Sequence, residues 1–487
     1  SASGRARQPQ QQHSTHAAAM TVKRITQDTF DSAVKENMET FEMDEEEAIQ
    51  SAVEEFEMQG VDLKGIIKSK GGGNMDGHPA SAALVALAAV GKELEAKEGD
   101  EELAKAALSC LADLDKALGD VPKDALSDLL VVLGQGVGGS TQLGAVEYLC
   151  GTARAAGPDV PLLMAAITQL HAFVKEDPNK TRFRRAAGPM LMKMIATDHR
   201  SNAAVLELVA ELGATTTWKH EDNKIDFMTA GMEKVYYQAL IDHRNEKGAL
   251  YAVCNAMNGL ARADDERAAA SQAFQNARAM AKLGSHEALV EALKVHKDED
   301  HALAGALCAT LKRVAVNEDI CKKVADLGGV PLMIQVLAAG GVSHVGLARS
   351  GCQVLRQLAG SDACKALIVE HGGLPVANGI VAAHRNNSQV LEQSIGIIAA
   401  CCLRAPELAE KAFAAACVES TMDVILENPG YQWAWRAWCL MVRNMVSRSP
   451  DLRPALLEKG VEATLRAAKV GPARNQCTDV ASAALRD

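Results

Sequence analysis

The turn sequence Gly329-Val330-Pro331-Leu332 recurs 44 residues later as Gly373-Leu374-Pro375-Val376. Related turns follow at Cys417-Val418-Glu419-Ser420 and Gly460-Val461-Glu462-Ala463. Towards the N-terminus the equivalent turns fall at Gly144, Gly188, Met232 and His286, which makes the successive intervals 44, 44, 54, 44, 44, 44 and 43 residues. A period of about 44 residues is typical of stacked helical repeats. It predicts one long repetitive array instead of several globular domains.

The hydrophobic pattern tests this period, because true repeats must keep one register of core positions. The longest helix of each unit is expected to start near Ser201, Asn245, Glu299, Ser343, Asn387 and Tyr431. Four positions in each helix, spaced i, i+4, i+7 and i+11, should face a shared core. Of these 24 positions 21 are hydrophobic, whereas a 48% hydrophobic composition would place between 11 and 12 there. The positions are Val205, Val209, Leu212, Thr216; Ala249, Val253, Ala256, Leu260; Leu303, Leu307, Thr310, Val314; Leu347, Gly351, Val354, Leu358; Leu391, Ile395, Ile398, Cys402; and Trp435, Cys439, Val442, Val446.

One unit should therefore contain three helices. The pattern predicts a short helix over Asp362–Glu370, a Gly-Gly turn, a second helix over Pro375–Ala383 and a long third helix over Gln389–Leu403. No such unit can bury its apolar face alone, so neighbours must stack into a continuous core. The predicted fold class is all-α, a right-handed superhelical solenoid with a concave face. The long interval is assigned to a projecting helix over Asp264–Leu283, closed by Gly284.

Composition divides the remaining chain into segments. Residues 1–19 are expected to be a disordered leader, 20–70 an acidic N-terminal helical module, 71–79 a Gly-rich linker and 80–143 a helical N-terminal cap, with the repeats in 144–487. An organelle transit peptide is the other interpretation of the leader, and the missing amphipathic stripe disfavours it.

The N-terminal module is predicted to be a helical hairpin with an acidic exterior. Its two apolar stripes are Phe30, Val34, Met38, Phe41 and Ala48, Ala52, Val53, Phe56. Asp44 is expected to cap the second helix, with Glu47 three residues later. Between Thr26 and Gly60 there are twelve acidic residues and one basic residue, Lys35, a balance of −11 that equals the net charge of the whole chain. The other 452 residues are therefore close to neutral.

Composition also excludes several classes of protein. Charged residues interrupt every apolar stretch before it reaches the roughly 18 to 20 residues that a membrane span needs. No basic stripe suited to nucleic acid follows the main body. The one dense basic run, Lys180–Arg185, is interpreted as a solvated helix edge, with an anion site as the alternative. The 12 cysteines are too sparse for a disulfide scaffold and indicate a reducing compartment, which predicts a cytoplasmic protein.

Candidate chemistry is weak throughout. Leu129–Leu133 followed by Gly134–Gly139 matches a dinucleotide fingerprint, with Asp159 further on. That motif requires a strand before the glycines and an acidic residue at the end of a second strand, whereas Asp159 follows a Gly-Pro turn. Neither the cysteine spacing nor His296 and His301 fits a zinc motif. We therefore predict no catalytic residue, no cofactor and no metal, and we expect the adjacent Cys401 and Cys402 to fill the core.

The three-helix unit with its Gly-Gly-Val/Leu-Pro turn resembles the armadillo repeat over roughly residues 144 to 487. The N-terminal segment Arg24–Asn37, together with Phe41-Glu-Met and Phe56–Leu63, is similar to the start of the armadillo repeat-containing protein 6 family. The resemblance implies an armadillo-repeat solenoid that works as a soluble adaptor without known catalysis.

One departure from the wider armadillo class matters. Repeat proteins of the nuclear-import type hold peptides with a ladder of Asn on the third helix. Here the equivalent column reads Thr215, Gly259, Arg313, Gln357, Cys401, Met445, or, one residue earlier, Ala214, Asn258, Lys312, Arg356, Ala400, Asn444. Neither is a ladder, so import-receptor function is disfavoured. Of the three neighbouring tryptophans, Trp435 falls in the core register, whereas Trp433 and Trp438 either anchor a partner or pack inside.

The sequence thus predicts a non-catalytic adaptor or scaffold that binds one or more unidentified proteins and neither nucleic acid nor the membrane interior. The candidate partner-binding residues are Asn258, Arg313, Arg356, Gln357, Trp433, Arg436 and Asn444. A permanent structural component of a cytoskeletal or ciliary assembly is the first alternative, and an NAD-dependent oxidoreductase is a disfavoured second one. The acidic module is expected to recruit a basic partner or to fold onto Lys180–Arg185.

Overall fold

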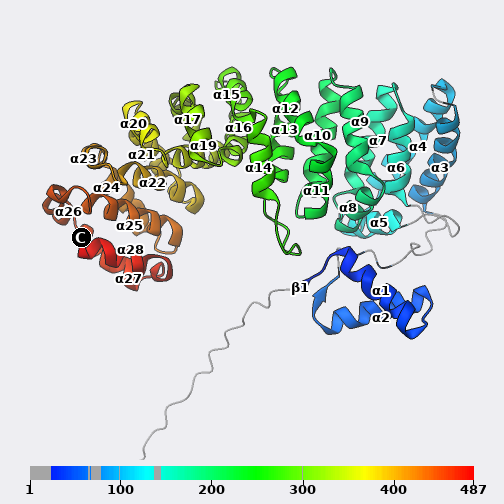
Figure 1. The fold of residues 1–487 in the computed structure, drawn as a ribbon, viewed down its shortest axis with the longest axis horizontal. Coiled ribbons are helices and arrows are strands. Elements are labelled where there is room, and N and C mark those ends of the chain that lie inside the picture. Colours follow the sequence, from blue (N-terminus) through cyan, green and yellow to red (C-terminus); the bar gives the residue numbers. More distant parts are fainter. Residues whose placement is uncertain are drawn as a thin grey trace, which may run out of the picture. The chain divides into compact units, whose positions relative to one another are not determined.

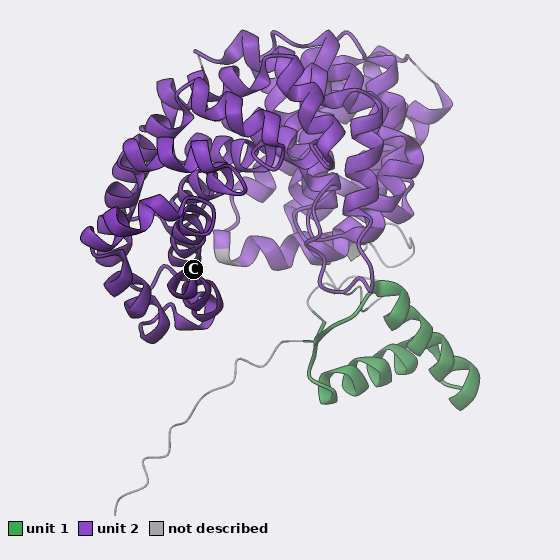
Figure 2. Ribbon diagram, turned by 60° about the vertical axis from the view of Figure 1, so that its left-hand side comes forward, with its two compact units in different colours: residues 1–69 green, residues 70–487 purple. Residues whose placement is uncertain are grey.

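The computed structural model describes residues 23–63, 66, 68, 78–97, 99–135, 144–298 and 300–487. The chain divides into two compact units, residues 1–69 and 70–487 (Figure 2). The expected disordered leader and residues 71–77 of the expected linker lie outside the described residues. Pro79, at the expected end of that linker, already begins a helix, because proline suits the first helical position.

The first unit is the predicted helical hairpin. Helix α1 (Gln27–Phe41) packs against α2 (Glu45–Met58), and strands β1 (Lys23–Arg24) and β2 (Val61–Asp62) pair in parallel. The rings of Phe30 and Phe56 lie 6.1 Å apart in its core, and Asp44 accepts a hydrogen bond from the Glu47 amide at 2.9 Å, as predicted. Met38 and Phe41, expected on the apolar stripe, are instead 38% and 62% exposed. The core of this small unit is complete without them.

The second unit is a curved stack of helices that begins with α3 (Pro79–Ala96) and α4 (Glu101–Gly119) and continues in sets of three (Figure 1). The first helices of the sets are α5 (Lys123–Gln135), α8 (Asp177–Arg185), α11 (Glu221–Ala230), α14 (Ala273–Lys282), α17 (Glu318–Asp326), α20 (Asp362–Glu370), α23 (Pro406–Ala414) and α26 (Arg453–Glu458). The second helices are α6 (Ala145–Ala155), α9 (Gly188–Asp198), α12 (Met232–Asp242), α15 (Ser285–His296), α18 (Gly329–Val336), α21 (Gly373–Ala383), α24 (Cys417–Glu427) and α27 (Val461–Val470). The third helices are α7 (Val160–Phe173), α10 (Ala203–Thr217), α13 (Lys247–Leu260), α16 (His301–Val314), α19 (Val345–Leu358), α22 (Ser388–Cys402), α25 (Gln432–Val446) and α28 (Arg474–Arg486). A π-helical turn, η1 (Leu337–Gly341), extends α18, and a 3-10 turn, η2 (Pro450–Leu452), precedes α26.

The third helices form the shared core. Each contacts the third helix of the next set, and all 24 positions of the predicted register are buried. The three non-hydrophobic members fit for local reasons. The hydroxyls of Thr216 and Thr310 donate to helix carbonyls at 2.8 and 2.9 Å, and a Cβ at Gly351 would come within 2.7 Å of Leu337. The predicted all-α armadillo solenoid with its N-terminal hairpin is therefore confirmed.

Polar side chains also form bonds between neighbouring repeats and between the helices of one repeat. At the end of the second helix, His199, His243, His296 and His384 each donate from Nε2 to a carbonyl of the preceding repeat, over 2.7 to 3.2 Å. Within single repeats, three lysines of the first helices are fully buried and donate to carbonyls at the end of the third helix of the same set: Lys180 to Trp218, Lys224 to Arg262 and Lys365 to Leu403. Each bond satisfies a carbonyl that the helix itself leaves open.

The same bonds correct the interpretation of Lys180–Arg185 as a solvated edge. Lys180 pairs with Asp177 at 2.8 Å and Arg182 pairs with Glu147 at 3.0 Å, and both cations are buried. Arg184 is shared between Asp222 and Asp226 on α11. Acidic residues within the solenoid therefore already bind these three cations, which weakens the expectation that the acidic module binds them.

The insertion differs from the predicted helix over Asp264–Leu283. Only α14 is helical there. The chain before it is a loop whose charged side chains form hydrogen bonds with the backbone of the preceding repeat. Asp264 accepts a hydrogen bond from the Lys219 amide and Asp265 accepts one from the Glu221 amide. Arg267 donates to the Lys219 carbonyl at 2.6 Å. Aspartates that bond backbone amides favour turns over helix interiors. Gly284, at φ +91°, does end the helix as predicted.

Within the described residues, no single helix has both the length and the hydropathy of a membrane span. Two bent helix pairs, Glu318–Asp326 with Gly329–Gly341 and Asp362–Glu370 with Gly373–Ala383, have them only jointly.

Candidate functional site

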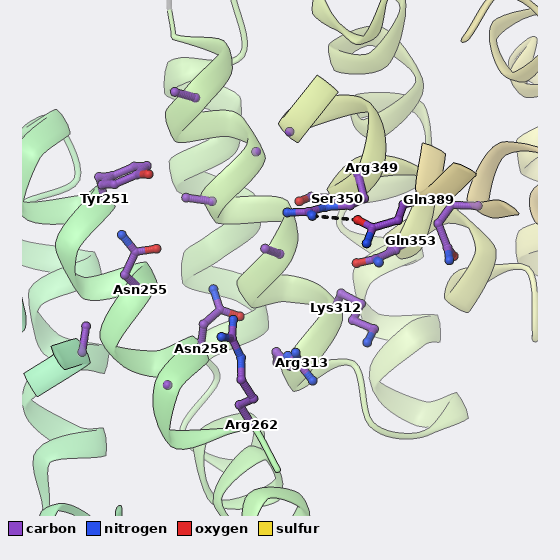
Figure 3. Close-up of a pocket in the computed structure, with 18 of the residues that line it drawn as sticks. Tyr251, Asn255, Asn258, Arg262, Lys312, Arg313, Arg349, Ser350, Gln353 and Gln389 are labelled. Atoms are coloured by element: carbon purple, nitrogen blue, oxygen red, sulfur yellow. Dashed lines mark hydrogen bonds between the residues drawn. The ribbon is translucent and has the colours of Figure 1, made fainter. Parts of the chain in front are cut away.

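A polar pocket of about 970 Å³ lies along consecutive third helices, from α10 to α22 (Figure 3). Each helix buries one stripe and turns another towards the pocket. On α16 the core stripe contains Leu303 and Leu307, whereas Ala302, Ala306 and Ala309 line the pocket. The helical period sets both stripes, so the repeat register that builds the core also builds this surface.

Small side chains on α16 make room for the pocket. Gly305 lies where α16 meets α19, and a Cβ built on it would sit 3.4 Å from the backbone of Leu347. The two helices therefore approach closely, and the alanines beside Gly305 leave the space above them open. The floor is short side chains, and the longer polar side chains stand around it.

Two half-exposed aromatic rings border one end of the pocket. Trp218 follows α10 and is 48% exposed, and Tyr251 on α13 is 45% exposed. Lys180 and Lys219 each place their ammonium group 5.0 Å from the centroid of the Trp218 ring. Since aromatic rings usually avoid water, an exposed pair beside a concave surface is available for a ligand.

A basic cluster lines the same pocket. Arg262 follows α13, and Lys312 and Arg313 lie in the last turn of α16; the three side chains lie together in the lower middle of Figure 3. Burial, and secondarily the charge of Arg313, lower the pKa of Lys312. Burial, and then the charge of Arg262, lower the pKa of Arg313, while Asp264 acts in the opposite direction. The three cations thus repel one another in a partly desolvated place.

The opposite end of the pocket carries amide groups. Arg349 donates to Gln389 at 3.0 Å, and Gln353 lies beside them (Figure 3). Gln393 also lines the pocket, and its side-chain oxygen accepts a hydrogen bond from Arg356 at 3.1 Å. Amide side chains both donate and accept hydrogen bonds, as a peptide backbone does. The arrangement is suited to holding a polar chain.

The structure brings two of the predicted site residues, Asn258 and Arg313, into the pocket lining. Asn258 is 8% exposed, and its amide donates to the Thr310 hydroxyl at 2.8 Å. Arg356 lies outside the lining and pairs with Glu392 at 3.1 Å, and Gln357 donates to the Ala315 carbonyl.

The remaining predicted site residues lie on α25, outside the pocket lining. Asn444 is buried and donates to the Ala399 carbonyl at 2.8 Å, and Arg436 pairs with Asp479 at the same distance. Trp433 is 55% exposed. Trp438, the other tryptophan considered as a partner anchor, is fully buried, with its ring centroid 6.5 Å from that of Trp435, so it packs inside.

Sequence reasoning missed most of the pocket. The residues that it did not single out include Trp218, Tyr251, Asn255, Arg262, Arg349, Gln353 and Gln389. A signal existed, because Tyr251, Asn255, Asn258 and Arg262 follow the spacing i, i+4, i+7 and i+11 on the side of α13 opposite to the core register. The Asn-ladder column samples only one position of that stripe.

The dinucleotide fingerprint lacks its structural context. Leu129–Leu133 and Gly134 lie in helix α5 and not in a strand, and residues 136–139 of the motif are outside the described part of the chain. Asp159 caps α7 by accepting the Leu162 amide at 3.0 Å. Among the described residues, no group of three or more His, Cys, Asp or Glu could hold a metal ion.

Cys401 and Cys402 fill the core, as predicted. Both thiols are fully buried. Burial raises the pKa of Cys401 to about 12 and that of Cys402 well above its usual value. Neither is a reactive thiolate near neutral pH.

Comparison with known proteins agrees with the N-terminal motifs. Residues 22–84 match the family described as the Armadillo repeat-containing protein 6 N-terminal domain. Armadillo repeat-containing protein 6 of Homo sapiens is 28% identical over 403 residues, 80% of this chain and 76% of the human one. The Drosophila melanogaster homolog is 26% identical over 389 residues, 79% and 78% of the two chains. The expected resemblance is therefore confirmed.

Among solved structures, an engineered protein shares the fold. It superposes with a TM-score of 0.64, covering 94% of this chain and 98% of its own, at 16% sequence identity. At that identity the likeness concerns the fold alone.

Proposed function

We propose that this relative of armadillo repeat-containing protein 6 is a non-catalytic scaffold that holds an extended segment of a partner protein in the pocket between α10 and α22. The observation that carries the proposal is the pocket itself, about 970 Å³ of concave, mostly polar surface built from one face of five successive third helices. Packed repeats hold such a surface in a fixed shape, so binding a partner costs little conformational entropy on the side of the solenoid.

The polar groups of the pocket support a binding role over a structural one. Asn255 is exposed and Gln353 is half-buried, and neither amide makes a side-chain hydrogen bond within the described residues. Polar groups whose only role is to hold the fold together normally bond to neighbouring repeats, as the histidines of the second helices do. These two amides are therefore open to an incoming chain.

Site-specific photocrosslinking tests the proposal. p-Benzoylphenylalanine replaces Tyr251, a half-exposed ring in the pocket lining, or Phe274, a ring on α14 that is 56% exposed and lies outside the lining. Both substitutions exchange one exposed aromatic side chain for another, so the fold should tolerate them equally. Irradiation in native extract should link the Tyr251 variant, and not the Phe274 variant, to discrete proteins identified by mass spectrometry.

Two results would count against the scaffold function. Equal products at both positions would mean that capture is unspecific, and no products at Tyr251 would leave the pocket without a partner. Persistence of the complexes in high salt decides between a transient adaptor and a permanent component of an assembly, because salt weakens exposed polar contacts.

The buried thiols favour a reducing compartment, and we propose a cytoplasmic location on that ground. Eleven of the twelve cysteines are buried and all twelve are free thiols. Alkylation during rapid lysis, followed by mass spectrometry, should find them reduced in cells, and a fluorescent fusion should report the location directly.

A further inference from the structure

We infer that the bound segment is acidic, and that its carboxylates are held by Arg262, Lys312 and Arg313 while the pocket amides hold its backbone. The inference deepens the proposed scaffold function and rests on it. It adds the chemistry of the partner and the residues that recognise it.

The charge of the pocket is the first support. Its lining contains four basic residues, Arg262, Lys312, Arg313 and Arg349, and one acidic residue, Glu392, a balance of +3. The chain as a whole carries −11. A concave, positively charged surface within an acidic protein concentrates field where low-dielectric walls surround it, and so attracts an anionic segment selectively.

The acidic residues near the cluster are already engaged, which is the second support. Asp264 has one carboxylate oxygen 2.5 Å from Nζ of the buried Lys224, and its other oxygen is 3.9 Å from Nε of Arg262. Glu392 pairs with Arg356, which is not part of the lining. The Asp264 carboxylate is therefore committed mainly to Lys224.

Lys312 and Arg313 have no carboxylate within ion-pair distance among the described residues. They are nevertheless half-buried. Burial, and then the charge of a neighbouring cation, lower both pKa values; that cation is Arg313 for Lys312 and Arg262 for Arg313. Desolvated like charges are costly unless an opposite charge joins them. A carboxylate seated between Lys312, Arg313 and Arg262 would remove this cost and would gain charge-assisted hydrogen bonds.

The surroundings favour a peptide over a nucleic acid. Asn255 and Gln353 offer donors and acceptors that match backbone amides and carbonyls along the same surface. A nucleic acid needs many phosphate contacts, and four cations in a chain of charge −11 supply few of them.

Peptide binding to the full chain tests the inference. The probe is a fluorescein-labelled twelve-residue peptide with Glu at alternate positions in a Gly-Ser background, followed by fluorescence anisotropy. Matched peptides carry Gln or Lys at those positions, and a labelled single-stranded oligonucleotide represents nucleic acid. The Glu peptide should bind, the Gln and Lys peptides should bind roughly tenfold more weakly or less, and added salt should weaken the complex.

Two charge reversals locate the contact. The double variant Lys312→Glu and Arg313→Glu should weaken binding of the Glu peptide roughly tenfold or more, because attraction becomes repulsion. The control, Lys322→Glu with Lys323→Glu, makes the same change in net charge on exposed positions of α17 outside the lining. It should leave the affinity within about twofold. Circular dichroism and melting of both variants check the fold, and the milder Lys312→Gln with Arg313→Gln replaces the reversal if that variant melts early.

The inference is overturned if the Glu peptide does not bind, if both reversals weaken it equally, or if the oligonucleotide binds as well as the peptide. Its failure can be told apart from failure of the scaffold function. Crosslinks at Tyr251 that survive the Lys312 and Arg313 reversal would retain the scaffold and remove the acidic partner, whereas their absence from the unmodified pocket would remove both.

Discussion

Replacing a buried lysine of the first helices by methionine should destabilise the protein by an amount that depends on how deeply the lysine's carboxylate partners are buried. Lys224 and Lys365 occupy equivalent positions, are both at most 1% exposed, and both donate to the carbonyl at the end of a third helix. Methionine keeps the length and removes the charge. Both substitutions remove the same hydrogen bond to a carbonyl, so any difference between their stability losses reports the different carboxylate partners.

The expected costs follow from the partners. Lys365 pairs with Asp362, whose side chain is 75% exposed and stays hydrated when the lysine is removed. Lys365→Met should therefore lower the free energy of unfolding by about 2 kcal/mol, the value of the lost charged hydrogen bond. Lys224 pairs with Glu221 and Asp264, whose side chains are 3% and 13% exposed. Removing one member of a buried ion pair costs about 3–5 kcal/mol, so Lys224→Met should be the more damaging by roughly 2 kcal/mol.

Urea denaturation followed by circular dichroism at 222 nm measures the difference. Repeat arrays need not unfold in one step, so amide hydrogen exchange in α13 and α22 should accompany it and show local opening next to the altered lysine. Equal losses for both variants would refute the reasoning, since the carbonyl bond alone would then account for the effect. So would a larger loss for Lys365→Met.

Three further predictions concern other parts of the solenoid. Gly373→Ala should lower stability by about 1–3 kcal/mol, because its Cβ would lie 2.6 Å from the Ile368 carbonyl oxygen. Gly379→Ala, on the same helix, meets nothing within 4 Å and should raise stability by about 0.5–1 kcal/mol. Thermal melts that rank the two variants the other way would contradict this. With Ellman's reagent at pH 8 only the partly exposed Cys110 should react in the folded protein, and all twelve thiols after unfolding, because burial raises the pKa of thiols such as Cys254 to about 12; rapid reaction of several thiols in the native state would argue against a closed core. Burial, and then the charge of Arg267, lower the pKa of His220 from 6.5 to about 3, so the unfolded chain takes up a proton that the folded chain refuses and stability should fall, by up to about 1.4 kcal/mol per pH unit, as pH drops from 6.5 towards 3. His220→Asn, which can still cap α11, should flatten that slope in urea titrations at pH 7.5 and 5; an unchanged slope would assign it to other groups.

The repeated core was predictable because it is written many times. A single amphipathic helix is ambiguous, but one register kept through six helices is not, and all of its positions proved buried, Thr216, Thr310 and Gly351 included. The hairpin cap at Asp44 was predictable for a different reason, since a capping bond spans only three residues.

The loop before α14 was not predictable from periodicity. Asp264, Asp265 and Arg267 bond to the backbone of Lys219 and Glu221, 44 to 48 residues earlier in the chain. Such long-range partners carry no local signal. The burial of Lys180 was missed for the same reason, because its carbonyl partner on Trp218 lies 38 residues away.

By itself the amino-acid sequence determined the helical period, the three-helix unit and the core stripe, because these depend on local spacing that recurs along the chain. Only the tertiary structure decided which charges are satisfied and which are left open. Lys180, Lys224 and Lys365 look no different in sequence from Lys312. The first three donate to a carbonyl at the end of the third helix of their own repeat, whereas Lys312 faces a pocket without a carboxylate partner among the described residues. The physical reason is that the electrostatic energy of a charged side chain depends on its neighbours in space, and stacking brings together residues about 40 positions apart in the chain.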